Sequence, residues 1–425
     1  MAHTPRAETS ESFPAVQQEI ARLASLPEVR ATFAWLLSQE SRISEWQLQL
    51  AQIPAPPFGE QARSEWLLER FMELGLDDAH TDEVGNIFGR RRGSAPHKAG
   101  QKYVTLSAHI DTVFPAGTPL NIRREGTRLY GPGISDNSAG VAALLAVAGA
   151  LQQNMIEHFA PILFIGNVGE EGEGDLRGMR HIFAESRWKE SIGCSLILDG
   201  AGSDTIVAEA LGSRRFEVIV RGPGGHSWSD FGAPNPIAVL ARAIESFRHT
   251  PMPSTPKTTF NIGVIRGGTS VNSIPESASM RIDIRSTSTA EIERLERALR
   301  VALDEAVENE SEASEARAPT QRRSVGLSAE VVAIGDRPAG ELPADARMRQ
   351  VIRAVDAHVG NVAQTQRAST DANIPLSMGR EALAIGGGGS GGGAHTLHEW
   401  FECTGRDLGL KRILLTLLAL AGVGK

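Results

Sequence analysis

Two residues at the end of an apolar segment have the types and spacing of a metal site. His109 and Asp111 close the run 103–111, whose continuous apolar character predicts a buried strand. Alternate side chains of a strand share a face, so both would emerge at its carboxyl end, where open α/β sheets bind ligands. A metal-bound imidazole commonly donates its other ring N–H to a carboxylate, which suits Asp111. Alone, the pair also fits a strand-end turn with satisfied polar groups.

Further carboxylates follow other apolar segments. Glu170 and Glu171 come directly after one such segment, Asp199 ends another, and Asp136 lies in a turn before an apolar helix. Adjacent carboxylates repel each other unless a cation or a proton lies between them, although a water-exposed acidic loop also dissipates the repulsion. Taken singly, Asp136 fits a helix N-cap and Asp199 fits a turn.

Three histidines lie in glycine-rich surroundings. His226 is part of the segment GGHSW and, taken alone, fits a surface loop beside Trp228. His395 and His398 follow the run GGGGSGGG at 386–393, which by itself resembles a flexible linker. No Gly-Lys-Ser/Thr follows this run, so it is not a phosphate-binding loop of the usual type.

Considered together, the residues outside the His226 region can converge on one edge of one sheet, because they lie at the carboxyl ends of strands or in the following loops. They form a ligand set of two histidines and three or four carboxylates, with neither cysteine nearby. Such nitrogen and oxygen ligands favour Zn²⁺, with Mn²⁺ or Co²⁺ as alternatives. The excess of carboxylates over the needs of one tetrahedral ion predicts two ions about 3.5 to 4 Å apart.

The elements that would position these residues alternate between helix and strand after an α-rich N-terminal segment. Continuous apolar strands separated by helices predict an α/β fold, with a mostly parallel sheet flanked by helices. Between 213 and 335 the pattern changes to β-α-β-β-α-β, which predicts an inserted ferredoxin-like domain. The catalytic domain would then consist of 1–212 and 336–425.

Composition limits the class of molecule and of partner. The chain has 425 residues and a net charge of −8, which disfavours binding to nucleic acid or to an anionic membrane. Its apolar stretches are shorter than the roughly 20 residues needed to cross a bilayer, and the polar start lacks the apolar core of a signal peptide. Cys194 and Cys403 cannot build a disulfide framework. We therefore expect a cytoplasmic protein.

The sequence resembles a known family through segments that occur in a fixed order. These are SAHIDTVFP, GPGISDNSAG, NVGEEGEGDLRGM, LILDG, GGHSW, GGTSVNSIP with MRIDIR, and AHTLHEW. They resemble the co-catalytic zinc amidohydrolases, which include peptidase T, carboxypeptidase G, aminoacylase and succinyl-diaminopimelate desuccinylase. The resemblance covers about residues 45–420. It implies that His109 and Asp199 hold one ion, that Glu171 and His395 hold the other, and that Asp136 bridges both.

The resemblance also implies the catalytic roles. Glu170 would be the general base, which takes a proton from a metal-activated water and returns it to the leaving amine. Asp111 would orient His109.

The family places the second metal-binding histidine four residues before a Glu-aromatic pair. Here that pair is Glu399 and Trp400, so His395 is preferred and His398 is the alternative.

The resemblance further implies that the inserted domain serves as a lid and as the interface of a homodimer. His226 would then approach the oxyanion, either in its own subunit or in the partner's site. Asn272 and Arg285 are weaker candidates for substrate contacts.

The expected substrate is a short peptide. In the family, Asp at the position of Asp199 is typical of di- and tripeptidases, which predicts an exopeptidase of the aminopeptidase kind. Two features depart from peptidase T. Ser138 stands where many members have Lys, and the segment GGHSW differs from the peptidase T motif. An N-acyl amino-acid amidohydrolase or a carboxypeptidase with the same site is the alternative. A non-catalytic binding protein on the same fold is a more remote one.

Overall fold

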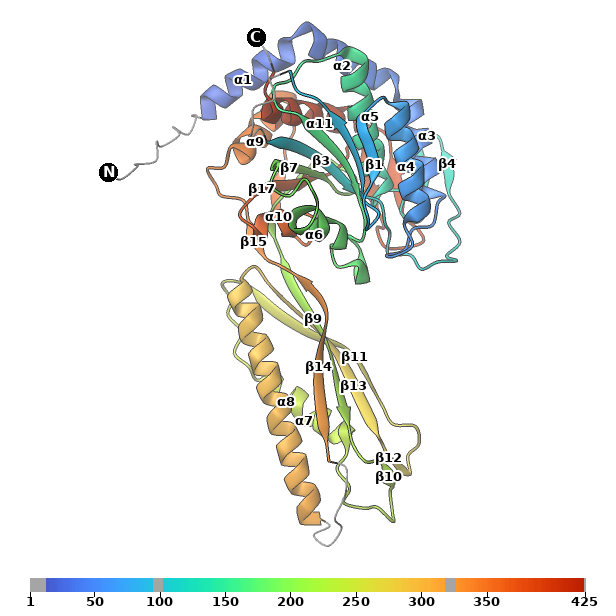
Figure 1. The fold of residues 1–425 in the computed structure, drawn as a ribbon, viewed down its shortest axis with the longest axis vertical. Coiled ribbons are helices and arrows are strands. Elements are labelled where there is room, and N and C mark those ends of the chain that lie inside the picture. Colours follow the sequence, from blue (N-terminus) through green and yellow to red (C-terminus); the bar gives the residue numbers. More distant parts are fainter. Residues whose placement is uncertain (1–12, 95–101, 318–325, 424–425) are drawn as a thin grey trace, which may run out of the picture. The chain divides into compact units, whose positions relative to one another are not determined.

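The computed structural model describes residues 13–94, 102–317 and 326–423 (Figure 1). It consists of two compact units, the first combining Met1–Ala210 with Glu341–Lys425 and the second running from Leu211 to Gly340. The insert was predicted at 213–335. Within the described ranges, no helix is long and apolar enough to cross a membrane.

A mainly parallel sheet forms the centre of the first unit. Its inner strands lie in the order β6 (Ile162–Asn167), β3 (Tyr103–His109), β7 (Ile192–Leu198) and β17 (Glu381–Ile385), and they run parallel. The outer strands are β1 (Asp77–Thr81), β2 (Ile87–Arg91), β8 (Thr205–Ala210), β15 (Gly340–Glu341) and β16 (Gln364–Ala368). Every residue of β3 and β6 is buried, as expected for parallel strands covered on both faces. The predicted α/β fold class is confirmed.

Helices lie around this sheet in Figure 1. They are α1 (Phe13–Ser25), α2 (Pro27–Ser38), α3 (Glu40–Ala51), α4 (Gln61–Glu73), α5 (Ser138–Asn154), α6 (Arg177–Ala184), α9 (Arg347–Val359), α10 (Asn373–Ser377) and α11 (Arg406–Ala421). Helix α5 is buried at every residue from Ser138 to Leu151, because it packs against β3 and also against α2 and α3. Its N-terminus is thereby fixed beside the strand that ends in His109.

The glycine run at 386–393 is packed against neighbouring loops, so its interpretation as a flexible linker was wrong. It leads into a small sheet of β18 (Ser390–Gly392), β19 (Trp400–Glu402), β5 (Arg128–Tyr130) and β4 (Arg123–Glu125). A Cβ at Gly386 would lie 2.4 Å from the carbonyl oxygen of Ala201, and one at Gly391 would lie 2.3 Å from Oγ of Ser135. Gly386 is needed because another backbone approaches closely, and Gly391 because a side chain lies where its Cβ would be.

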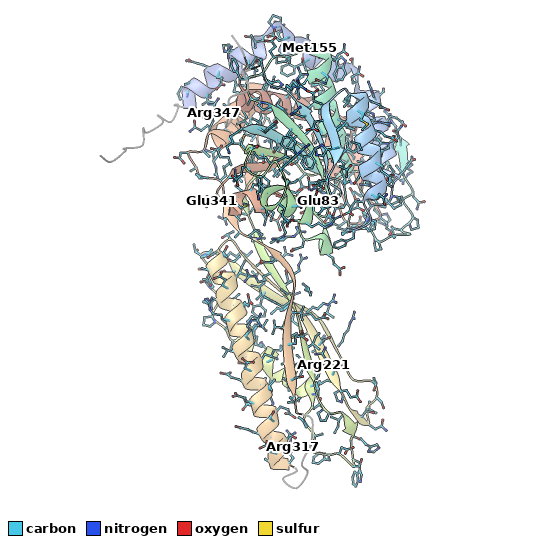
Figure 2. The ribbon with its side chains drawn as sticks, viewed as in Figure 1. Glu83, Met155, Arg221, Arg317, Glu341 and Arg347 are labelled. Atoms are coloured by element: carbon cyan, nitrogen blue, oxygen red, sulfur yellow. The ribbon has the colours of Figure 1, made fainter. Side chains whose placement is uncertain are left out.

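The second unit has its own sheet and hydrophobic core. Its antiparallel strands lie in the order β11 (Thr258–Gly267), β13 (Ser277–Ser286), β9 (Gly212–Arg221) and β14 (Ser328–Arg337). Helices α7 (Pro236–Arg248) and α8 (Thr289–Arg317) and the short pair β10 (Gly225–His226) and β12 (Ser273–Ile274) complete it. The chain order β9-α7-β11-β13-α8-β14 is the predicted ferredoxin-like one. Arg317, at the end of α8, is labelled in Figure 2.

Candidate metal centre

The predicted ligands of the first unit lie where its parallel strands end. His109 is the last residue of β3, and Asp199 follows the last residue of β7. Glu170 and Glu171 come three and four residues after the end of β6. These strands are hydrogen-bonded neighbours that run in one direction, so their carboxyl ends meet at the same edge of the sheet.

Asp136 lies at the centre of the group. Its Oδ1 is 3.1 Å from Nε2 of His109, and its Oδ2 is 3.1 Å from Nε2 of His395. The same nitrogen of His395 is 3.1 Å from Oε1 of Glu171, and Nε2 of His109 is 3.8 Å from Oδ1 of Asp199. One carboxylate therefore faces both imidazoles through separate oxygens, as a bridging ligand would.

The donor atoms fit two divalent cations. In the described parts of the chain, ligand atoms lie within 4.8 Å of one another in three overlapping sets: His109 with Asp136 and Asp199, Asp136 with Glu171 and His395, and His109 with Glu170 and Glu171. The donors are imidazole nitrogens and carboxylate oxygens, which suit Zn²⁺ and also Mn²⁺ or Co²⁺. Carboxylates outnumber imidazoles in the group, so a cation would offset the repulsion between them.

The electrostatic environment of the two imidazoles favours positive charge. Hydrogen bonds to Asp136 and Glu171 raise the pKa of His395 to about 10. Burial acts to lower the pKa of His109, but neighbouring carboxylates, Asp111 foremost, raise that pKa well above its usual value. Burial likewise opposes the shift at Asp136, yet the two imidazoles lower the pKa of its carboxyl. A site that holds protons in this way is also one in which divalent ions would displace them.

Asp111 connects His109 to the acid pair. Its carboxylate is fully buried and lies 3.5 Å from Nδ1 of His109. It accepts the backbone N–H of Glu170 at 3.0 Å and that of Glu171 at 2.8 Å. Burial would raise the pKa of Asp111, but His109 and these N–H groups lower it. The same carboxylate can therefore orient the imidazole and fix the backbone of both glutamates.

Asn137 is one of the residues that the sequence reasoning missed. Its Oδ1 accepts the N–H of Gly200 at 3.0 Å and its Nδ2 donates to the carbonyl oxygen of Leu198 at 2.9 Å. It thus connects the residue after Asp136 to both neighbours of Asp199. The sequence signal was present but ambiguous, because Asn137 is also the N-cap of α5.

Arg63 and Glu399 were also missed. Arg63 is buried on α4 and donates from Nε to the carbonyl of Ile53 and from Nη1 to that of Ile110, both at 2.8 Å. Burial lowers the pKa of Arg63 to about 10, although the negative charges of Asp111 and Glu399 oppose this. Burial also raises the pKa of Glu399 to about 7. In the sequence analysis Glu399 served only to identify His395 as the preferred metal-binding histidine.

The structure brings His395, and not His398, to the other ligands. His395 has a φ of +64°, an unusual backbone conformation for a residue other than glycine. The backbone N–H of His398 donates to Oγ1 of Thr396, and His398 belongs to none of the ligand sets found in the described ranges.

The remaining candidates lie in the second unit. His226 is exposed, and its Nδ1 accepts the backbone N–H of Trp228 at 3.2 Å, which leaves Nε2 to carry the proton in the neutral ring. The N–H of the residue after His226 donates to the carbonyl oxygen of Asn272 at 2.9 Å. Arg285 lies at the far end of β13 from Asn272. His226 therefore lies beside Asn272, whereas Arg285 lies apart from both of these residues.

Comparisons with known proteins give a family match. The family model described as "Peptidase family M20/M25/M40" matches residues 105–418. A probable carboxypeptidase of Ajellomyces dermatitidis is 30% identical over 236 residues, 51% of this chain and 52% of that protein, so the chain spans about half the length of this relative. A succinyl-diaminopimelate desuccinylase of Nitrosospira multiformis is 27% identical over 277 residues, 61% of this chain and 71% of that protein.

The fold also matches a solved structure. The crystal structure of aminopeptidase PepT from Bacillus cereus has a TM-score of 0.70 and 20% identity, over 90% of this chain and 99% of that one. At this identity the likeness concerns the fold.

Proposed function

This chain belongs to peptidase family M20/M25/M40, and from that membership we propose that it is a metal-dependent exopeptidase that hydrolyses an amide bond of di- and tripeptides. The resemblance drawn from the ordered motifs is confirmed by the family match. One observation carries the proposal: the carboxylate of Asp136 faces His109 with one oxygen and His395 with the other.

The proposal assigns the ligands to two ions. His109 and Asp199 would hold one ion, Glu171 and His395 the other, and Asp136 both. When bound, such ions polarise a water molecule and the substrate carbonyl. Zinc is the expected metal, with Mn²⁺ or Co²⁺ as alternatives, because all the donors are nitrogen or oxygen.

Glu170 is the proposed general base. Its side chain is buried beside the ligands, and its backbone N–H is held by Asp111. A carboxylate in this place can take the proton of the attacking water and later deliver a proton to the leaving amine nitrogen.

The second unit is proposed to act as a lid. His226 would donate its Nε2–H to the oxyanion of the tetrahedral intermediate, because its Nδ1 is already occupied as an acceptor. Asn272 would support the same loop, and Arg285 would contact substrate elsewhere on this unit.

We further propose a homodimer formed through the second unit. Strand β11 lies at the edge of the sheet, and an edge strand offers backbone groups to another chain. The unpaired state of Cys194 and Cys403 fits a reducing compartment, which supports the expected cytoplasmic location.

A deacylase of N-acyl amino acids, or a carboxypeptidase, is the second candidate function. It is favoured by the similarity to a succinyl-diaminopimelate desuccinylase and to a probable carboxypeptidase. A non-catalytic binding protein is less favoured, because the chain keeps Glu170 together with the complete ligand set.

A substrate panel separates these functions. Metal-loaded and chelator-treated protein would be assayed on di- and tripeptides, N-acyl amino acids and folate-like glutamates. The proposal expects metal-dependent hydrolysis of peptides whose amino end is free. Activity restricted to N-blocked amino acids would replace it with the deacylase function, and turnover unaffected by chelation would contradict both.

A further inference from the structure

Glu399 accepts hydrogen bonds from the loop that contains Asp136. The Glu399 side chain is fully buried, and its Oε2 accepts the backbone N–H of Gly133 at 2.8 Å. Its Oε1 accepts the N–H groups of Ser135 and Asp136, both at 2.7 Å. The backbone carbonyl of Glu399 accepts a further N–H from Gly131, at 3.0 Å. Glu399 therefore accepts hydrogen bonds from backbone N–H groups at both ends of this loop.

The same residue is closely connected to His395. The N–H of Thr396 donates to the carbonyl of Gly393, and the N–H of Glu399 donates to the carbonyl of Thr396. These bonds fold 393–399 into compact turns that contain His395. Strand β19 begins at Trp400 and pairs with β5, in register with Tyr130. The loop that follows β5 contains Asp136, and the turns that contain His395 precede β19. Both segments are therefore adjacent to the same pair of strands, β5 and β19.

Hydrogen bonds of this kind are directional. A carboxyl group that accepts several backbone N–H groups forms short bonds to them, and a buried N–H without an acceptor is strongly unfavourable. The loop around Asp136 can therefore change its conformation only by breaking its bonds to Glu399. Asp136 and His395 lie 259 positions apart in the chain, and Glu399 is the residue that bonds to the backbone around both.

We propose that Glu399 is a positioning residue for Asp136, the carboxylate assigned to both ions. It would hold the Asp136 loop in place without being a ligand. This inference rests on the proposed function of Asp136 as a ligand. Because Asp136 faces His109 with one oxygen and His395 with the other, both ions should depend on Glu399.

The sharpest test is Glu399→Gln. The amide has nearly the same shape, but its NH₂ group must face at least one backbone N–H where an oxygen now accepts. We expect both ions to bind about 10- to 100-fold more weakly than in the wild type, the usual effect of removing a residue that supports a ligand. Isothermal titration of the chelated protein with Zn²⁺ measures both affinities, and elemental analysis after dialysis gives the ion content.

Asp356→Asn is the matched control. Asp356 is a buried carboxylate of α9 that bonds to Arg412 through both oxygens, at 2.6 and 3.0 Å, and it belongs to none of the ligand sets in the described residues. Removing its charge should lower the thermal midpoint of the chelated protein and leave two ions bound. Glu399→Gln should lower that midpoint by no more than the control while binding both ions more weakly.

A double variant tests whether the effect passes through Asp136. His395→Ala alone should bind one ion, and adding Glu399→Gln to it should weaken that remaining ion as well, because Asp136 lies with His109 and Asp199 in its ligand set. If Glu399→Gln fails to fold, Glu399→Asp keeps the charge, shortens the reach and should also weaken both ions.

Two ions bound by Glu399→Gln with wild-type affinity would overturn the inference, even if the protein hydrolyses peptides as proposed. Weakening confined to one ion would show that Glu399 does not act through Asp136 and would overturn it too. A wild type that binds two ions but hydrolyses no amide would refute the proposed function and leave the inference standing.

Discussion

The imidazole of His395 lies 3.1 Å from the carboxylate of Asp136, although 259 positions separate the two residues in the chain. Asp136 precedes helix α5, whereas His395 follows the glycine run and strand β18. The small sheet brings them together, because β18 and β5 both pair with β19. Two loops that are distant in the chain are thereby fixed against each other at the site.

Glu170→Gln should abolish most of the amide hydrolysis and leave the metal site intact. The amide cannot accept a proton from water, and loss of a general base lowers the rate by about 10²- to 10⁴-fold. Steady-state kinetics and metal content measured on the same preparation check this prediction. Near-normal turnover would remove Glu170 from the proposed role.

Replacement of each C-terminal histidine should separate the ligand from its neighbour. His395→Ala should lose one of the two ions, because its Nε2 lies 3.1 Å from both Asp136 and Glu171. His398→Ala should retain both ions and serves as the control, three residues away. Metal content after dialysis decides between the two, and the reverse pattern would show that the ligand was misassigned.

His226→Ala should lower kcat by about 10²- to 10³-fold, the usual effect of losing one oxyanion donor, with unchanged metal content. The exposed His249, which follows the last residue of α7, is the matched control, because among the contacts described its side chain bonds only to Glu245. His249→Ala should leave kcat unchanged. Loss of metal from His226→Ala would mean that His226 acts as a ligand instead.

His158 should make the stability of the metal-free protein depend on pH. Burial, assisted by the Arg91 cation, lowers the pKa of His158 to about 4 against the hydrogen bond to Ala160. Because the unfolded chain, with a pKa near 6.5, then binds more protons, the contribution is complete above about pH 6.5 and is lost as the pH falls towards 4. The shift corresponds to at most about 3 kcal/mol.

Urea unfolding of the wild type and of His158→Leu between about pH 7 and 4 tests this, because the effects of other titrating groups cancel in the difference. The wild type should lose stability faster than the variant as the medium becomes acidic. Parallel curves would show that His158 remains free to protonate in the folded state.

Much of the fold could be predicted because burial leaves a direct mark on the sequence. Strands β3 and β6 are mainly apolar, and every residue of both is buried. The end of α8 leaves a weaker pattern in the sequence. One of its buried positions is Glu310, which forms ion pairs with Arg242 and Arg317 and interrupts the apolar period.

The glycine run shows where composition alone is ambiguous. A glycine either gives the backbone freedom or allows another backbone to approach, and the sequence is the same in both cases. At Gly391 the requirement for glycine comes from close approach, because the side chain of Ser135 lies where a Cβ would be. Glu399 was missed for a related reason. Its partners are backbone N–H groups, which every residue except proline possesses and which leave no pattern of types or spacing.

The central claim is that two ions share Asp136, and anomalous diffraction from crystals of the zinc-loaded protein tests it most directly. We predict two peaks, one among His109, Asp136 and Asp199 and the other among Asp136, Glu171 and His395. A single peak, or peaks away from these side chains, would contradict the account.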